Sequence, residues 1–359
     1  MRHHIRILCL AVGLCFLPFI AGCNQNPSDG DFVSSVSFSP DSQTLVIGYE
    51  KGLLKIIDLK TGDELREFKG EIPKGTHQLT ETAISPNGKI LACGFVGRFE
   101  DTINTWDIVT GKIKRIIPQA AQAIAFSPDG KILADGGAEW KNENWSVATL
   151  LWDTQTGKLK QTLRRSMVGT VRSIAFAPNG QTLLMANDIE DPKTEMLTMD
   201  AVVSAWNTAS GKMLWSSKEP ITLMPLVACS PANNIVANVC GDTVKLRDNK
   251  TGKVLRTLKA AAKSEQSPPI TALSFSPDGT VLAVGSQLGD MALWSVQKGT
   301  FLRSLNNHVG SVTSIEYSPD GKLIASGSED HTVNLWNTHT WEVIRSIGKK
   351  YQYKPNPFS

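Results

Sequence analysis

Residues 308–336 read HVGSVTSIEYSPDGKLIASGSEDHTVNLW, and this stretch contains the local signals that the rest of the chain repeats. Its centre, Ser318-Pro319-Asp320-Gly321, has the chemistry of a tight turn. Proline presets φ, aspartate hydrogen-bonds its own backbone, and glycine accepts a positive φ. Short runs rich in β-branched and apolar residues lie on both sides of the turn. The stretch therefore predicts a β-hairpin.

The same turn begins seven units along the chain. Successive turn prolines lie 42 to 53 residues apart, a period that fits one four-stranded unit. The seven turns are Ser39-Pro40-Asp41-Ser42, Ser85-Pro86-Asn87-Gly88, Ser127-Pro128-Asp129-Gly130, Ala177-Pro178-Asn179-Gly180, Ser230-Pro231-Ala232-Asn233, Ser276-Pro277-Asp278-Gly279 and Ser318-Pro319-Asp320-Gly321.

A second motif closes each unit and is dominated by tryptophan before a polar residue. Four residues after that polar residue comes a glycine in six units, and Trp341 in the seventh. A glycine there suits a tight turn into a fourth strand. The seven motifs are Ile57-Asp58, Trp106-Asp107, Trp152-Asp153, Trp206-Asn207, Arg247-Asp248, Trp294-Ser295 and Trp336-Asn337.

Seven such units in register resemble the WD40 family of propellers, and the resemblance covers residues 33–348. It predicts an all-β fold, a seven-bladed β-propeller of four-stranded antiparallel blades, followed by a tail at 349–359. Stacked blades bury the sheet faces that one blade alone would expose. Because residues 23–32 are not strand-like, we expect blade 7 to complete itself with Glu342–Ile347.

The resemblance also assigns a structural role to one set of polar residues. In the family, a His, a Ser, an Asp and a Trp form a hydrogen-bonded tetrad within a blade. Blade 7 has all four. In blade 6 leucine takes the Asp place, and in blade 2 cysteine takes the Ser place. A catalytic triad is disfavoured, because the serine is expected to be buried in mid-strand. The tetrad residues are His308, Ser326, Asp330 and Trp336.

The first residues have the pattern of an export signal. A basic start with Arg2 and Arg6 precedes an apolar run, 7–20, that is too short for a membrane span of about 20 residues. The quartet Ile20-Ala21-Gly22-Cys23 then resembles the lipobox of bacterial lipoproteins. This predicts a signal peptide at 1–22. An ordinary cleaved signal and an uncleaved anchor remain alternatives.

The resemblance to lipoproteins implies that Cys23 is lipidated and becomes the mature N-terminus. Residues 23–32 then form a flexible tether to an exported, membrane-anchored protein. Several acyl chains hold much better than one, because each buried methylene contributes about 0.8 kcal/mol. In Gram-negative lipoproteins, a residue other than aspartate after the lipidated cysteine suggests the outer membrane. By this resemblance, Asn24 suggests the outer membrane facing the periplasm, if the cell is Gram-negative.

Charge and composition argue against several functions. The net charge is +3, and it falls to about +1 once Arg2 and Arg6 are removed, so nucleic-acid binding is not indicated. The expected innermost strands contain few titratable residues, namely Glu81, Arg172 and Glu316, and the remaining histidines lack metal-ligand spacing. We therefore expect no catalytic residues, no metal and no cofactor.

Cysteines and basic runs receive structural interpretations. The propeller thiols are Cys93, Cys229 and Cys240. We favour buried free thiols over a disulfide, because Cys229 should face Val236 and not Cys240. Basic runs at 112–115, 158–160 and 164–165 fall on expected outer strands, where lysine discourages the addition of foreign strands. Binding of anionic lipid or nucleic acid is the alternative.

Three adjacent units carry extra residues between their second and third strands. These segments, Phe95–Asp101, Gly137–Val147 and Asn187–Asp200, are expected to be loops on the face that also carries the links between blades. Insertions on one face of a repeat fold often mark its binding face. Aromatic and methionine side chains there are the candidate partner-binding residues: Phe99, Trp140, Trp145, Met196 and Met199.

The leading hypothesis is a membrane-tethered, non-catalytic scaffold that binds a protein or peptide through this face. One alternative is a component of envelope assembly, because Trp206 to Trp215 resembles the tryptophan motif of quinoprotein-type propellers. Other blades place leucine where Trp215 stands, as in Leu258 and Leu305. A propeller enzyme is the remaining alternative.

Overall fold

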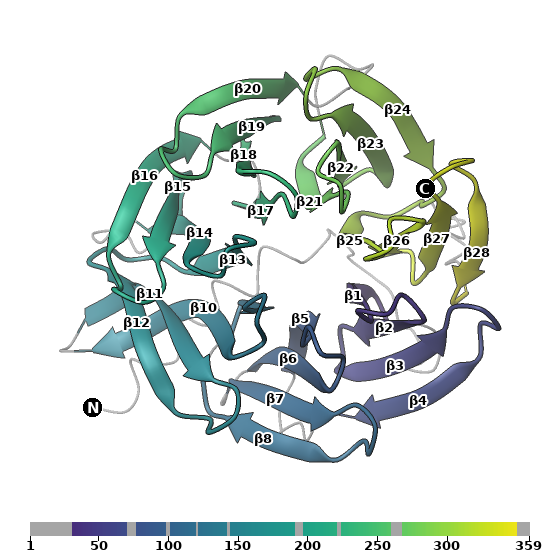
Figure 1. The fold of residues 1–359 in the computed structure, drawn as a ribbon, viewed down its shortest axis with the longest axis horizontal. Coiled ribbons are helices and arrows are strands. Elements are labelled where there is room, and N and C mark those ends of the chain that lie inside the picture. Colours follow the sequence, from purple (N-terminus) through teal and green to yellow (C-terminus); the bar gives the residue numbers. More distant parts are fainter. Residues whose placement is uncertain are drawn as a thin grey trace, which may run out of the picture.

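The computed structural model describes residues 31–69, 77–97, 101–119, 121–141, 144–190, 197–220, 224–259 and 268–349. Their regular secondary structure consists of 28 β-strands in seven four-stranded antiparallel sheets. The sheets are arranged like blades around a common axis, in chain order (Figure 1). The prediction of an all-β, seven-bladed propeller is confirmed.

Each blade uses four consecutive strands, from the innermost to the outermost. Blades 1 to 4 contain β1 (Val33–Phe38), β2 (Thr44–Tyr49), β3 (Leu53–Asp58), β4 (Glu64–Lys69), β5 (His77–Ile84), β6 (Ile90–Gly97), β7 (Thr102–Asp107), β8 (Ile113–Ile117), β9 (Ala123–Phe126), β10 (Ile132–Lys141), β11 (Asn144–Asp153), β12 (Leu159–Arg165), β13 (Val171–Phe176), β14 (Thr182–Glu190), β15 (Leu197–Asn207) and β16 (Met213–Pro220).

The remaining three blades repeat the same order. They contain β17 (Val227–Cys229), β18 (Ile235–Cys240), β19 (Thr243–Asp248), β20 (Val254–Lys259), β21 (Ile270–Phe275), β22 (Val281–Ser286), β23 (Asp290–Ser295), β24 (Phe301–Asn306), β25 (Val312–Tyr317), β26 (Leu323–Ser328), β27 (Val333–Asn337) and β28 (Val343–Ile347).

The turn between the first two strands of blade 7 shows why the repeated motif folds locally. The Ser318 hydroxyl donates to Asp320 Oδ1 over 2.7 Å, and Lys322 N–H donates to the same oxygen over 3.1 Å. Gly321 then takes a φ of 73°, which other residues adopt only with strain. The serine, the aspartate and the glycine therefore close this hairpin together.

The core lies between neighbouring blades. One cluster joins Leu246 and Leu258 of blade 5 to Phe275 and Leu282 of blade 6, with each side chain at most 5 % exposed. Another joins blade 1 to strands β26 and β27 of blade 7. Each blade therefore buries both faces of its sheet against its two neighbours, as the stacking argument requires.

The ring closes between blades 7 and 1 without a shared sheet. Strand β28 pairs with β27, so blade 7 completes itself, as predicted. Across the junction, Phe38 N–H donates to Glu316 Oε2 over 2.8 Å, and the Thr313 hydroxyl donates to the Val33 carbonyl over 2.6 Å. Side chains of the innermost strands thus join the first blade to the last.

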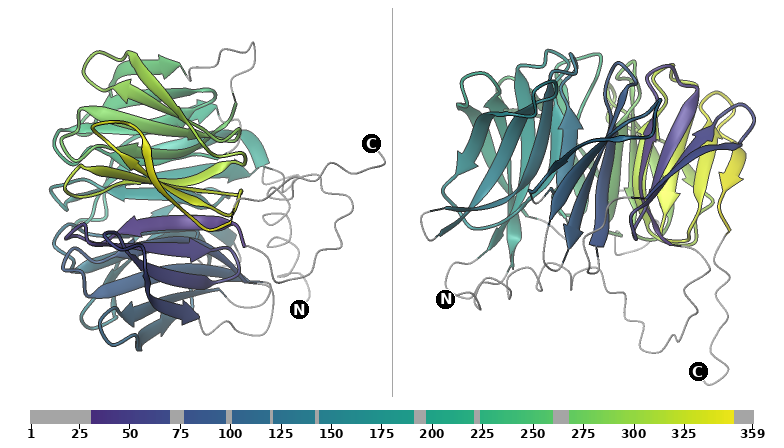
Figure 2. Two further views of the ribbon diagram at one scale, coloured as in Figure 1. Left: turned by 90° about the vertical axis from the view of Figure 1, so that its right-hand side faces the viewer. Right: turned by 90° about the horizontal axis from the view of Figure 1, so that it is seen from below.

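The antiparallel order gives the disc two different faces, seen edge-on in Figure 2. The turn face carries the turns between first and second strands and between third and fourth strands. The hairpin face carries the connections between second and third strands and the links between blades. The chain crosses the disc once in each strand, so the four strands of a blade return it to the face from which it started. Strand β1 therefore begins, and strand β28 ends, on the hairpin face.

Candidate functional site

Blades 3 and 4 are extended at the hairpin face. The described parts of the segments expected to be loops are largely strands, which corrects that expectation. Residues Gly137–Lys141 of β10 pair with Asn144–Ala148 of β11. In blade 4, Asp188 pairs with Ala201 and Glu190 pairs with Leu197. The backbone groups of the extra residues pair with each other, so a longer hairpin forms in place of an open loop.

Strands β10 and β11 have ten residues each, compared with six in β2 and β3 of blade 1. Four more residues lengthen a strand by about 13 Å. The end of this hairpin reaches beyond the ring at the left of Figure 1. The extension therefore presents a surface that the shorter blades do not have.

The five candidate partner-binding residues are distributed unevenly over this region. Trp140 and Trp145 are directly opposite each other in the register of β10 and β11. Met199 lies in β15 of the neighbouring blade. Phe99 and Met196 lie outside the described residues. The binding role of the five residues remains a prediction. Of the five, the hairpin places Trp140 and Trp145 opposite each other.

Two exposed apolar side chains also lie on the hairpin face. Leu288 is 67 % exposed in the connection between β22 and β23, and Val309 is 66 % exposed in the link from blade 6 to blade 7. The two segments touch, because a Cβ on Gly289 would lie 2.7 Å from the His308 carbonyl oxygen. In the sequence, Leu288 was notable only as a replacement for aspartate, and Val309 was missed.

The four tetrad side chains of blade 7 form one hydrogen-bonded chain. His308 Nδ1 lies 3.0 Å from Asp330 Oδ2, and His308 Nε2 lies 2.8 Å from Ser326 Oγ. Trp336 Nε1–H donates to the same serine oxygen over 2.9 Å. Ser326 is fully buried. This serine has no access to a substrate, so the geometry supports a structural role and not a nucleophile.

Blade 5 replaces this arrangement with a charged network, because Arg247 stands where five of the other blades have tryptophan. Arg247 Nε–H donates to Asn238 Oδ1 over 2.8 Å, and its guanidinium pairs with Glu219. Lys245 Nζ lies 2.7 Å from the other oxygen of Glu219. Glu219 belongs to β16, so the network crosses from blade 4 to blade 5. Sequence reasoning missed this partner of Arg247.

Blade 3 places a carboxyl group beneath its tryptophan. Asp135 is 1 % exposed and accepts a hydrogen bond from Trp152 Nε1–H. Burial raises the pKa of Asp135 to about 7, and the bond from Trp152 opposes that rise only in part. The carboxyl group therefore titrates near neutral pH inside the core.

The Asp135 carboxyl should make the stability of the propeller depend on pH. Its pKa is higher in the folded chain than in the unfolded chain, so its stabilising contribution is present at low pH and is lost as the pH rises through 7. We expect the melting temperature to fall between pH 5 and pH 8, and Asp135→Asn to reduce that fall by several degrees. Differential scanning fluorimetry across this range measures it.

Asp153→Asn serves as the matched control, because Asp153 lies in a surface turn and hydrogen bonds from Thr156 lower its pKa. This variant should retain the full fall in melting temperature between pH 5 and pH 8. An unchanged fall in Asp135→Asn would contradict the assignment.

A side chain from each outermost strand reaches the turn between the third and fourth strands of the next blade. It occupies the eighth position after the polar residue of the closing motif. Examples are Arg66, which donates to the Val109 carbonyl over 2.9 Å, and Arg256, which donates to the Gln297 carbonyl over 2.8 Å. We call this contact the clasp. The clasp residues are Arg66, Arg115, Gln161, Trp215, Arg256, Arg303 and Arg345.

The clasp explains two departures in the sequence. Trp215 Nε1–H donates to the Asn249 carbonyl over 2.7 Å, and Trp215 lies opposite Ala205 as Arg256 lies opposite Leu246. The alignment of Trp215 with Leu258 was therefore wrong. In blade 7, Trp341 replaces the turn glycine, and the Arg303 guanidinium lies over its ring at 5.9 Å.

Trp215→Ala should lower the free energy of unfolding by about 3 kcal/mol, because a large half-buried ring and its hydrogen bond are lost. Trp215→Arg should lower it by less than half as much, since arginine performs the same contact in five blades. Urea denaturation followed by circular dichroism measures both. Equal losses in the two variants would show that position 215 is not a clasp.

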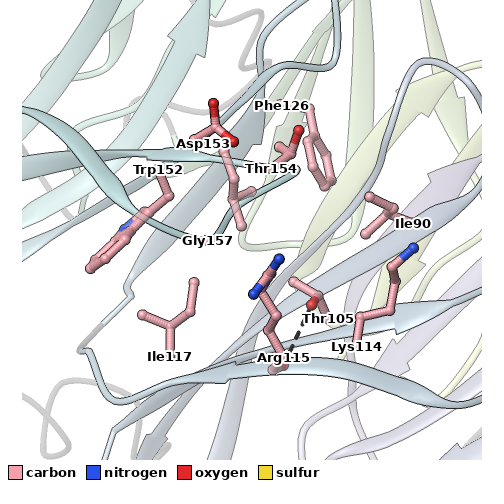
Figure 3. A pocket seen from close by; sticks show the side chains of 11 residues that line it. Ile90, Thr105, Lys114, Arg115, Ile117, Phe126, Trp152, Asp153, Thr154 and Gly157 are labelled. Atoms are coloured by element: carbon pink, nitrogen blue, oxygen red, sulfur yellow. Dashed lines mark hydrogen bonds between the residues drawn. The ribbon is translucent and has the colours of Figure 1, made fainter.

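A small cavity lies under the clasp between blades 2 and 3. Figure 3 shows Arg115 beside it, with Ile117, Phe126 and Trp152 on its walls. Its volume is about 20 Å³, room for about one water molecule. It belongs to the packing between blades and does not offer a ligand site.

Two carboxyl groups expected to be scattered prove to be close enough to interact. Burial raises the pKa of Glu81 to about 7 and that of Glu316 to about 8, and the charge of Glu81 contributes to the second rise. Glu81 Oε2 accepts the Ile124 N–H over 2.8 Å, and Glu316 makes the equivalent bond to Phe38. Each carboxyl therefore joins its own blade to the next one.

Arg172, the third titratable residue noted on the inner strands, is paired. Its Nε lies 2.6 Å from Asp188 Oδ2 in the same blade. Among the described residues, no group of three or more histidine, cysteine or acidic side chains could hold a metal ion. The titratable groups noted on the described inner strands thus make contacts between blades or an ion pair.

The three propeller cysteines are free thiols, as predicted. Cys229 pairs in register with Val236 and is partly buried, whereas the thiols of Cys93 and Cys240 are buried. The basic runs at 112–115, 158–160 and 164–165 lie on or beside the outermost strands β8 and β12. Their position agrees with protection of exposed sheet edges.

The blade geometry defines a seven-bladed β-propeller, and family models of WD40 repeats match parts of its sequence. The family model described as "WD domain, G-beta repeat" matches residues 23–58 and 299–337, so WD40 repeats are present toward both ends of the chain. A second model, the anaphase-promoting complex subunit 4 WD40 domain, matches residues 259–313.

Proteins with similar sequences are longer than this chain. Periodic tryptophan protein 2 of Arabidopsis thaliana is 22 % identical over 289 residues, which cover 79 % of this chain and 26 % of that protein. WD repeat-containing protein slp1 of Schizosaccharomyces pombe is 23 % identical over 283 residues, covering 77 % and 52 %. The chain thus spans a quarter to a half of these relatives.

Among solved structures, Kuenenia stuttgartiensis hydrazine synthase superimposes with a TM-score of 0.71 and 18 % identity, covering 89 % of this chain and 99 % of the matched chain. At this identity the likeness shows the fold alone. In the described part of this chain, no helix is long and apolar enough to cross a membrane.

Proposed function

We propose that the protein is a membrane-tethered, non-catalytic scaffold that binds a protein partner through its hairpin face. The observation that carries the proposal is the lengthened β10–β11 hairpin, with the lengthened β14–β15 hairpin beside it in the next blade. Both add surface on one face while the ring itself stays regular. Binding residues in repeat folds concentrate on such one-sided extensions.

Exposed apolar side chains on the same face support this proposal. Leu288 and Val309 are each about two-thirds exposed, and the segments that carry them touch, so together they offer one small apolar patch. The residues that contribute most to binding at protein interfaces are enriched in tryptophan, tyrosine and arginine, so this patch adds apolar contact and the tryptophans of the extended hairpin are the candidate anchors. The hairpin face therefore offers apolar contact on blade 6 and on the link to blade 7, in addition to the extended hairpin of blade 3.

The contacts along the axis favour binding over catalysis. Glu81 and Glu316 accept backbone N–H groups of neighbouring blades, and Ser326 is buried with its hydroxyl in the tetrad. These groups contribute to the structure of the ring. Trp215 makes the clasp contact that arginine makes in five other blades. Its tryptophan motif is therefore explained by packing between blades and does not support the envelope-assembly alternative.

Shortening the β10–β11 hairpin should abolish most partner capture without unfolding the ring. Residues 140–145 are replaced by Asn-Gly, which joins Glu139 to Ser146 in a two-residue turn and keeps the buried Val147. We expect capture by cross-linking in intact envelopes to fall at least about tenfold, because Trp140 and Trp145 are removed together. The melting temperature should stay within about 2 °C, since the core is unchanged.

Val109→Ala is the control, since Val109 is 74 % exposed on the turn face. It should capture the same partner as the unmodified chain. If the shortened protein captures its partner equally well, the binding surface must lie elsewhere.

A further inference from the structure

We propose that the hairpin face lies toward the membrane and takes only partners that are themselves held at the membrane surface. This orientation depends on the lipid anchor at Cys23 that is part of the proposed function. To that function it adds the orientation of the ring and the class of partner, a membrane-embedded or lipid-anchored protein.

The contacts of the first described residues fix where the chain enters the ring. The Phe32 carbonyl accepts the Glu50 N–H over 2.9 Å, and the centroid of the Phe32 ring lies 5.0 Å from that of His331. Asp31 forms an ion pair with Lys51. These partners belong to the second-to-third-strand connections of blades 1 and 7. The entry point is therefore held on the hairpin face.

The entry point also lies close to the axis, because β1 is the innermost strand of its blade (Figure 1). Asp31 lies eight positions after Cys23. Fully extended, eight residues span at most about 29 Å. Whatever the tilt of the disc, the entry point beside the axis then stays within this distance of the bilayer.

That distance is shorter than an ordinary soluble domain. A domain of about 100 residues has a radius of gyration of about 13 Å, which for a compact sphere corresponds to a diameter of about 34 Å. Such a domain does not fit between the bilayer and the face at the entry point. The surface of a membrane-embedded protein, or of a partner on its own short anchor, does fit. The turn face, on the other side of the disc, has no such restriction.

The test uses streptavidin as a soluble probe of each face. Leu288→Cys places a thiol on the hairpin face, and Val109→Cys places one on the turn face, both at highly exposed positions. Burial raises the pKa of each native thiol, at Cys93, Cys229 and Cys240, so these thiols should resist labelling. Each lipidated full-length variant is biotinylated and placed in vesicles of phosphatidylethanolamine and phosphatidylglycerol.

We expect streptavidin to bind biotin at position 288 at least about tenfold more slowly on vesicles than in detergent micelles. At position 109 the rates on vesicles and in micelles should agree within about twofold. The reason for the difference is that the bilayer shields only the hairpin face. About forty glycine and serine residues inserted after Pro27 should remove the difference at position 288. Equal rates at both positions with the native tether would overturn the inference while leaving the scaffold function standing.

Failure of the proposed anchor is measured separately. Mass spectrometry of the N-terminal peptide shows whether Cys23 carries lipid. An unlipidated peptide from membranes overturns the tethering and the orientation together. The shortened β10–β11 hairpin is tested in the chain with its native tether. Loss of partner capture in that variant tests only whether the hairpin face binds the partner.

Discussion

Glu219→Ala should lower the free energy of unfolding by about 3–5 kcal/mol, the cost of breaking a buried ion pair by removing one partner. The Glu219 side chain is 1 % exposed and that of Arg247 is 5 % exposed. Without Glu219 the guanidinium keeps its bonds to Asn238 and to the Gly252 carbonyl, but its charge has lost this counter-ion in the core. Equilibrium unfolding in urea measures the loss.

Glu64→Ala is the matched control. It breaks the pair between Lys55 and Glu64, which has the same 2.7 Å separation as the pair between Lys245 and Glu219 but lies at the surface. Exposed pairs contribute about 0–1 kcal/mol, so the control should lose little.

A double variant separates the charge from the packing. Removing both buried charges with Glu219→Leu and Arg247→Leu should recover much of the loss, because an apolar pair leaves neither of these charges unpaired. A loss in Glu219→Ala no larger than that in Glu64→Ala would contradict this account.

Asp330→Ala should lower the free energy of unfolding by about 3 kcal/mol, because several buried donors lose their acceptor at once. Asp330 Oδ2 lies 3.0 Å from His308 Nδ1 and also accepts the Val309 N–H over 3.0 Å. Its other oxygen accepts the Thr332 N–H over 3.0 Å. Chemical denaturation of the purified ring measures the effect.

Two further variants make this prediction specific. Asp330→Asn keeps one acceptor oxygen and should lose less than the alanine variant. Asp320→Ala removes a carboxylate from a surface turn of the same blade and should cost about 1 kcal/mol. Equal losses in the Asp320 and Asp330 alanine variants would exclude a special role for the buried aspartate.

The loss of Asp330 should also weaken the start of the ring. The turn that Asp330 holds contains His331, whose ring packs against Phe32 where the chain enters β1. We expect faster amide hydrogen exchange at residues 32–38 in Asp330→Ala than in Asp320→Ala. The tetrad thus connects the stability of blade 7 to the position of the entry point.

The repeated local signals were sufficient to predict the blades. Turn chemistry at Ser318–Gly321 and its six counterparts depends on neighbours within five residues, so it can be recognised in the sequence. The same locality allowed the pairing of Cys229 with Val236 to be predicted. The loops of blades 3 and 4 were misjudged, because length alone does not distinguish an open loop from a longer hairpin.

Contacts between blades could not be predicted in the same way. Glu219 and Arg247 are 28 residues apart, and nothing in the sequence near either residue indicates the other. The clasp has a sequence signal, a long side chain eight residues after each closing motif, but its meaning appears only once the next blade is in place. The sequence pattern instead paired Trp215 with the core residue Leu258.

Short-range backbone chemistry, repeated seven times along the chain, was enough to specify the number of blades, the order of their strands and the turns that join them. The side chains that join one blade to the next, the hairpin form of the extra segments in blades 3 and 4, and the contacts that hold the entry of the chain became apparent only in the folded ring. Those features depend on how separate sheets stack around the axis, and that arrangement brings together residues far apart in the sequence.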